Sequence, residues 1–357
     1  MGEQVRRLAV VLTLLFFYGS LAAAQSSNDV KLCDDMSNPD QSIIHCTAEI
    51  ESGQVSAANL PAVLYNRGTA HLYLLHYDQA IQDFNQAIKL DPTHADTFAN
   101  RGNAYYGKKD YDRALQDYGE AIRLNPGDFH AFGCAGDVLF AKGDLSGAIK
   151  NYDEAIRLNP NIEGAFYGRG HAYQGRGEFE RAIQDYDQAI RLHPNSVNAI
   201  ASRGRALMNS GSFDRAIGDL SLALKLQPGY TFALRNLALA YGKKGDYDNA
   251  IQYLDQAIAQ DPNEASDFVN RGYCYSRNQD YDHAIQDYTH AIRLNPSYVP
   301  AYFDRAEAYV EIGDFDRAIK DYDSALKLNP SSTRIIARRI WPTLFCKCRA
   351  LRRARNL

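Results

Sequence analysis

Six arginines recur at related places along the chain, and each is followed sixteen residues later by an aspartate. Such residues can form ion pairs between packed helices, or the arginines can form a row that binds an acidic ligand. We expect ion pairs, because the two places that lack the arginine also lack the aspartate and carry Asn151 and Tyr253 instead. Pairs of this kind are weak evidence for stability, but they can fix the register of stacked helices. The residues predicted to pair, within one unit or between neighbouring units, are Arg67 with Asp83, Arg101 with Asp117, Arg169 with Asp185, Arg203 with Asp219, Arg271 with Asp287 and Arg305 with Asp321.

Residue types that serve catalysis or bind metals show no comparable order. The nine histidines occur at unrelated places, and the sequence contains no serine nucleophile turn, phosphate-binding loop or zinc motif. Cys346 and Cys348 supply two thiols, whereas a structural zinc site needs four ligands. The carboxylates fall in turns and on outer helix faces, where solvation is their expected role. We therefore predict a protein that is not an enzyme, with no catalytic residue, cofactor or metal.

The elements that position these residues follow a period of 34 residues. Eight prolines are spaced 34 residues apart from Pro92 to Pro330, and we count each as position 32 of a unit. Every unit then has alanine at positions 20 and 27, six units have glycine at position 8, and position 24 is always large and apolar or aromatic. This spacing predicts two closely packed helices per unit. Turns such as Gly245-Asp246-Tyr247-Asp248 combine a helix-ending glycine with carboxylates that favour the start of the next helix.

The period also predicts the organisation of the chain. Residues 25–60 form a degenerate half-unit that caps the first full one, because residues 40–46 align with residues 78–84. The basic tail, residues 333–357, has three alternative roles: a short capping helix with a solvated end, a contact with a membrane surface or polyanion, or an altered reading frame without a selected role. The eight units are 61–94, 95–128, 129–162, 163–196, 197–230, 231–264, 265–298 and 299–332.

Over residues 61–332 this pattern resembles the tetratricopeptide repeat family, in the form found in exported bacterial proteins. The resemblance implies an all-α fold, a right-handed superhelical solenoid of eight 34-residue helix-turn-helix units. It also implies that the first helix of each unit lines a concave groove, which binds extended peptides or helices of partner proteins.

The resemblance further implies which residues face the partner. Four asparagines at position 6 resemble the asparagine ladder in the repeat domain of O-linked N-acetylglucosamine transferase, in which side-chain amides hold a peptide backbone. The series is interrupted across three middle units, and the carboxylate clamp of chaperone adaptors is not matched. Aromatic anchors are common in interfaces. The predicted peptide-binding residues are Asn66, Asn100, Asn236, Asn270, Tyr65, Tyr106, Tyr167, Arg205, Arg235 and Tyr273.

The first 24 residues have the pattern of a secretory signal peptide. Arg6 and Arg7 precede an apolar run over residues 8–17, and small residues over 20–24 predict cleavage before Gln25. An uncleaved anchor is the alternative. Export would place the protein where disulfides persist, so we predict a bond between Cys33 and Cys46 and a periplasmic or secreted location.

The charge is distributed unevenly. The chain has a net charge of −4, but residues 25–330 carry about −13, whereas residues 331–357 contain eight basic residues and no acid. An acidic body argues against nucleic acid as the main partner. Contact with a membrane would have to involve the basic tail.

These observations favour a non-catalytic scaffold that binds a peptide or helix of an envelope or secreted protein in the groove. Two alternatives remain open: a module that binds carbohydrate or an envelope polymer through tyrosine and asparagine side chains, and an accessory subunit of an envelope enzyme. Self-association into a homo-oligomer through an end unit also remains open.

Overall fold

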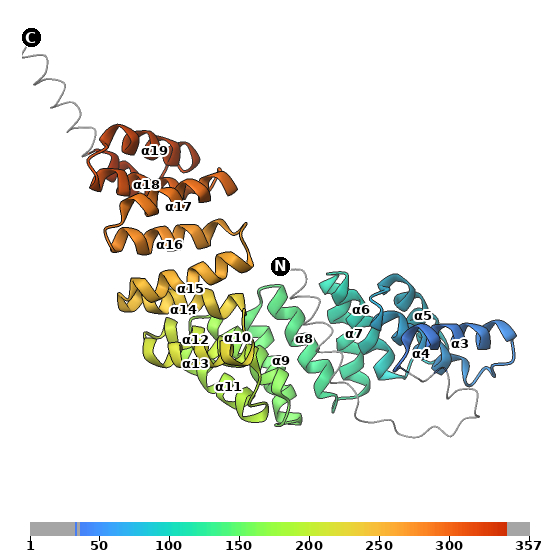
Figure 1. Cartoon of the computed structure of the whole chain (residues 1–357). Helices are drawn as coiled ribbons and strands as arrows, with labels where there is room; N and C mark the ends of the chain where they lie inside the picture. Colours follow the sequence, from blue (N-terminus) through green and yellow to red (C-terminus); the bar gives the residue numbers. More distant parts are fainter. Residues whose placement is uncertain (1–32, 34–35, 341–357) are drawn as a thin grey trace, which may run out of the picture. The chain divides into compact units, whose positions relative to one another are not determined.

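In the computed structural model, the described part of the chain, Cys33 and residues 36–340, consists of helices joined by short turns. Figure 1 shows the helices following one another in chain order. The predicted signal peptide, residues 1–24, and the end of the tail, residues 341–357 with Cys346 and Cys348, lie outside the described residues. The helices are α3 (Pro39–Ser52), α4 (Leu60–Tyr73), α5 (Tyr77–Leu90), α6 (Ala95–Gly107), α7 (Tyr111–Leu124), α8 (Phe129–Ala141), α9 (Leu145–Leu158), α10 (Glu163–Gly175), α11 (Phe179–Leu192), α12 (Val197–Asn209), α13 (Phe213–Leu226), α14 (Thr231–Lys244), α15 (Tyr247–Gln260), α16 (Ala265–Arg277), α17 (Tyr281–Leu294), α18 (Val299–Glu311) and α19 (Phe315–Leu328).

The helices belong to two compact bodies, the N-terminal body up to Pro194 and the C-terminal body from Asn195 onward. Within each body, every helix packs against the next one along the chain. The first helices of neighbouring units also contact one another, α4 with α6, α6 with α8, and α8 with α10 in the N-terminal body, and α12 with α14 and α16 with α18 in the C-terminal body. The first helices thus form one layer, which we call the first-helix face of each body. The predicted all-α repeat solenoid is confirmed.

The turn between the two helices of a unit depends on two residue types. An aspartate caps the second helix in most units; Asp110, for example, accepts a hydrogen bond from the backbone N–H of Arg113. The residue before it adopts a left-handed conformation, as Gly245 does with φ of 83°. Glycine adopts this conformation without a steric cost, and five units have glycine there, whereas Leu75, Lys109 and Gln279 hold it in the other three.

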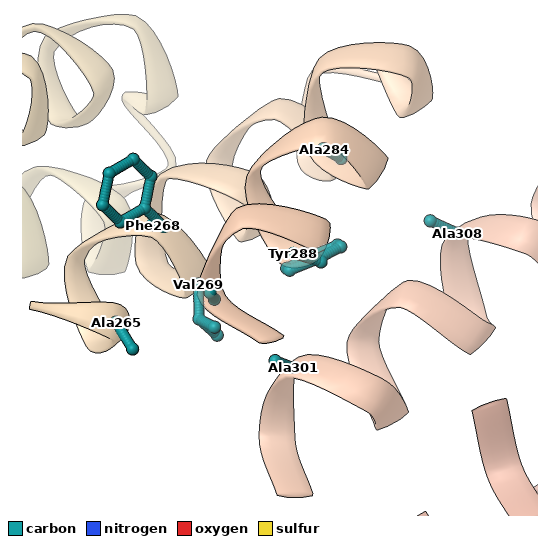
Figure 2. Packing of buried hydrophobic residues seen from close by; sticks show 8 residues of the cluster. Ala265, Phe268, Val269, Ala284, Tyr288, Ala301 and Ala308 are labelled. Carbon is teal, nitrogen blue, oxygen red and sulfur yellow. The ribbon is translucent and has the colours of Figure 1, made fainter. Parts of the chain in front are cut away.

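The core of each unit combines alanines with one large side chain. The alanines at positions 20 and 27 are buried in every unit, and the rings of Tyr118, Tyr152 and Tyr186 lie between helices, also buried. Figure 2 shows one such cluster, in which Tyr288 of α17 lies near Val269 of α16 and Ala301 of α18. Small residues let the backbones approach, and the rings fill the space that remains.

The half-unit at the N-terminal end is stapled by a disulfide. Cys33 and Cys46 are bonded and fully buried, and they pack against Val63 of α4. The hydroxyl of Ser42, which is also buried, donates a hydrogen bond to the backbone oxygen of Cys33 (2.7 Å). Helix α3 therefore covers the exposed side of the first unit, as a terminal cap must.

Residues 333–340 are helical and cover the other end. Ile335 is buried against Phe303 and Tyr322, and the guanidinium of Arg334 lies 4.4 Å from the centre of the Phe303 ring. This described part of the tail therefore acts as a short capping helix. Among the described residues, no helix is long and apolar enough to cross a membrane.

Candidate functional site

The structure brings all six predicted arginine–aspartate pairs together within their own units. In each pair the guanidinium donates two hydrogen bonds to the carboxylate, and the shorter contact of each pair is 2.6 or 2.7 Å. The aspartate side chains are only 4–14% exposed. The arginines are therefore engaged in packing, and the alternative of an anion-binding row has no geometric support.

At least five of these arginines also reach the second helix of the preceding unit, or α3 of the half-unit. Arg169 donates through its second terminal nitrogen to Asp153 (2.5 Å), and Arg271 does the same to Asp255 (2.6 Å). The corresponding acceptors for Arg67, Arg101 and Arg305 are Thr47, Asn85 and Thr289. Each arginine thus joins three helices and fixes their register.

Arg235, which was predicted to face the partner, is engaged in ion pairs within the chain. Its guanidinium binds Asp267 of α16 (2.8 Å), whose side chain is 1% exposed, and also Asp261 (3.2 Å). Its unit is one of the two that lack the usual pair and instead stacks Tyr241 on Tyr253, with ring centres 5.6 Å apart. Arg235 therefore joins α14 to α16.

Two of the four asparagines in the predicted ladder have amides that are engaged within the chain. Asn236 is buried, and its amide donates to the backbone oxygen of Phe232 in its own helix (2.7 Å). The amide of Asn100 donates to the hydroxyl of Tyr65 (3.1 Å), so these two predicted residues bridge α6 and α4. Asn66 is partly exposed on α4. The asparagines therefore do not form one uniform row of donors.

The aromatic members of the predicted set lie on the first-helix face. In the N-terminal body, Tyr106 packs beside Tyr111 at 5.9 Å between ring centres, and Tyr167 packs beside His171 at 4.5 Å. In the C-terminal body, Arg205 is exposed and lies over Phe232 at 5.8 Å from the ring centre. The rings of Tyr106 and Tyr167 thus pack against neighbouring aromatic rings, and the guanidinium of Arg205 lies against a ring.

A pocket of about 220 Å³ opens between α14 and α16 on the first-helix face of the C-terminal body. Two predicted residues, Asn270 and Tyr273, lie at this pocket, and Tyr273 is 48% exposed. Leu239, across from them on α14, is 40% exposed. The buried side chains of Ala238, Leu254 and Cys274 form an apolar floor. The full lining is Ala238, Leu239, Gly242, Lys243, Leu254, Asn270, Tyr273 and Cys274.

The side chains of this pocket are suited to binding a ligand. Burial raises the pKa of the Cys274 thiol to about 11, so the thiol is protonated near neutral pH and is a poor nucleophile. Among the described residues, no group of three histidine, cysteine or acidic side chains is arranged to hold a metal ion. The pocket offers an apolar floor, an amide, a phenol and an ammonium group.

Models of one protein family match most of the repeat region. The model described as tetratricopeptide repeat matches residues 61–94, 95–128, 164–196, 266–298 and 299–332. A second model with that description matches 202–265, and a model described as TPR repeat matches 136–177. The chain belongs to the tetratricopeptide repeat (TPR) family. No curated protein sequence matches it.

Solved TPR structures share the fold. A tetratricopeptide repeat protein from Parabacteroides merdae is 18% identical over 70% of this chain and 98% of its own, with a TM-score of 0.56. A chain in the crystal structure of the APC/C heterotetramer Cut9–Hcn1 is 16% identical over 86% of this chain and 60% of its own, also with a TM-score of 0.56. At such identities the likeness establishes the TPR fold and nothing about a partner.

The TPR repeat pattern did not single out the residues that complete the pocket. Leu239 and Lys243 occupy positions 9 and 13 of their unit, which the family likeness places on the groove side. The sequence signal that could have indicated the pocket is Leu239, an apolar residue at position 9, where most other units have a polar one.

Proposed function

We propose that this TPR protein is a non-catalytic scaffold whose first-helix face binds a peptide segment or helix of a partner protein. The pocket between α14 and α16 is the observation that carries this proposal. Pockets that enclose small molecules are usually 300–1,000 Å³, and a pocket of about 220 Å³ better suits one large apolar side chain.

The rim of the pocket suits a polypeptide. The amide of Asn270 can donate to a backbone carbonyl and accept from a backbone N–H. Exposed Leu239 and Tyr273 provide apolar contact on opposite sides, as anchor pockets in helix and peptide complexes do.

We also propose that the protein acts outside the cytoplasm. The signal pattern over residues 1–24 and the buried Cys33–Cys46 bond both support export, since structural disulfides persist in oxidising compartments. Mass spectrometry of protein recovered from the exported fraction tests this proposal, because cleavage would leave Gln25 as the first residue.

Site-specific photocrosslinking tests the binding site. A photoreactive phenylalanine analogue replaces Tyr273, which is exposed and aromatic, and in a matched control it replaces Leu222 of α13, which is 42% exposed. We expect irradiation of the exported fraction to give a discrete protein adduct from position 273 and none from 222. Adding Leu239→Asp should abolish the adduct, because a carboxylate in the apolar wall opposes burial of an apolar anchor.

Two outcomes would contradict the proposal. Equal adducts from positions 273 and 222 would mean contact without specificity. No protein adduct from position 273, in a variant that melts like the wild type, would remove the pocket as a protein-binding site.

A further inference from the structure

Asp137 of α8 differs from the buried aspartates at position 23 in the N-terminal body. Asp83, Asp117 and Asp185 each pair with an arginine of their own unit. Asp137 has no ion-pair partner among the residues that the structure describes. Its Oδ1 accepts a hydrogen bond from the hydroxyl of Tyr152 (2.7 Å).

An aspartate is not needed to hold that tyrosine. At the corresponding position of the preceding unit, the amide oxygen of Asn103 accepts the same bond from Tyr118, also at 2.7 Å. Desolvation raises the pKa of Asp137 to about 6, so the carboxylate is still mostly ionised at neutral pH. A desolvated anion without a counterion costs free energy that an asparagine would avoid, and a cation from outside would offset that cost.

The surroundings of Asp137 leave room for such a cation. Asp137 is partly exposed on the first-helix face. Gly133 on the same helix and Gly164 on α10 have open space where a side chain would stand. A Cβ at Gly168 would lie 2.6 Å from the Tyr152 ring, so glycine there lets this ring reach Asp137.

Aromatic rings complete the surroundings. Phe140 lies three residues after Asp137, which places both side chains on one face of α8, and Phe140 is 36% exposed. The faces of aromatic rings attract ammonium and guanidinium groups. A carboxylate without an ion pair, bare backbone and an exposed ring thus occur together on α8 and α10.

We propose that Asp137 and Phe140 form a subsite for a cationic side chain, the ammonium group of a lysine or the guanidinium group of an arginine, of the bound partner. The inference rests on the proposed function only for the claim that the cation belongs to a polypeptide. The subsite lies in the N-terminal body and makes no use of the pocket between α14 and α16.

Nuclear magnetic resonance with two small probes tests the subsite directly. The full chain is labelled with ¹⁵N-glycine and titrated with Nα-acetyl-lysine amide, or with Nα-acetyl-norleucine amide, which has the same stem without the ammonium group. Gly133→Ala and Gly164→Ala, at positions with open space for a methyl group, identify two of the nearby glycine signals. We expect saturable shifts of Gly133 and Gly164 with the lysine probe and none with the norleucine probe.

Asp137→Asn supplies the second arm of the test. It retains an acceptor for Tyr152, as Asn103 does for Tyr118, and we expect it to weaken binding of the lysine probe at least about tenfold. The control is Asp112→Asn, which removes an acid from α7 whose side chain is 86% exposed and paired with Lys142. This control should leave the affinity unchanged.

The outcomes are distinct from those of the pocket test. Equal shifts with both probes, no shifts with either, or unchanged binding by Asp137→Asn would each overturn the subsite. If Asp137→Asn failed to fold, the comparison of the two probes on the wild type would still decide. None of these results alters the crosslink expected at Tyr273.

Discussion

Glycine at position 8 gives the large side chain at position 24 its place in the core. A Cβ built on Gly102 would lie 2.9 Å from the Tyr118 ring, and one on Gly170 would lie 2.8 Å from the Tyr186 ring. The recurring glycine therefore has a packing reason that outweighs its low helix propensity. The eighth unit has Ala306 at position 8, packed in one cluster with Tyr322, so the fold can also accommodate alanine at this position.

We predict that Gly102→Ala lowers the free energy of unfolding by about 1 kcal/mol, because the methyl group must displace a buried ring. Gly119→Ala is the matched control: Gly119 lies in the helix α7, is exposed and has nothing within 4 Å of the added Cβ. This control should raise the free energy of unfolding by about 1 kcal/mol through helix propensity. Urea denaturation measures both, and a Gly102→Ala variant as stable as Gly119→Ala would contradict the packing explanation.

Asp137 gives a second prediction at this scale, for stability against pH. Burial among Cys134, Tyr118 and Tyr152 raises its pKa from an ordinary 3.8 to about 6 in the folded chain. The folded state thus holds this proton more tightly than the unfolded state, so the contribution of Asp137 to stability falls as pH rises from about 4 to 6 and is constant above.

Asp137→Asn should remove this dependence and raise the free energy of unfolding at pH 7 by about 1–3 kcal/mol. Denaturation of both proteins at pH 4 and pH 7 measures the difference. A variant less stable than the wild type at pH 7 would show that the carboxylate is stabilised in a way that the Tyr152 contact does not explain. A more stable variant that loses the lysine probe would show that the acid is retained for binding at a cost in stability.

At the scale of helices, the arginines at position 7 link neighbouring units. Arg101 binds Asp117 of α7 in its own unit and Asn85 of α5 in the preceding one (2.7 Å each). The planar guanidinium has enough donors for both contacts, which a lysine could not supply in the same geometry. Helix pairs and their stacking are thus coupled through one side chain.

A charge swap tests this link. Arg101→Asp alone should lower the free energy of unfolding by about 3–5 kcal/mol, because it leaves Asp117 buried beside a like charge. Adding Asp117→Arg should restore at least half of the loss. The control is the exposed pair Arg123 and Glu120, for which the same swap should change stability by less than about 1 kcal/mol. A double variant that melts no higher than the worse single variant would show that the pairing does not stabilise the helices.

At the scale of the whole molecule, the chain is an array in which each unit is stabilised by its neighbours, so its ends are its weakest places. Helix α3 covers one end and residues 333–340 the other. The two caps differ in kind, because the first is held by a buried disulfide, whereas the second relies on Ile335 and on surface contacts such as Arg338 with Glu307 (3.5 Å).

Loss of the disulfide should therefore act locally. We predict that Cys33→Ser/Cys46→Ser destabilises the cap by about 3 kcal/mol, the value for a short closed loop. Hydrogen exchange should show lost protection over α3 and α4, with α16–α19 unchanged. Equal loss of protection along the whole chain would mean that the cap is not an independent element of stability.

The amino-acid sequence by itself determined the period, the helix pairs, the alanine core and the six ion pairs. These features depend on contacts between residues less than about 34 positions apart. Such contacts can be predicted because the same pattern recurs in eight units. The Cys33–Cys46 bond was predictable for a similar reason, since the two cysteines lie close together before the repeats and the half-unit aligns with its neighbour.

Only the tertiary structure decided what the variable residues do. Asn236 and Asn270 share one position of the repeat, yet one amide turns to its own helix and the other lines a pocket. Arg235 pairs with Asp267 of the next unit, a contact that the repeat pattern does not indicate. The position of a residue in the repeat determines the helix face on which it lies. Its contacts depend on the neighbouring side chains of two or three helices, and these side chains change from unit to unit.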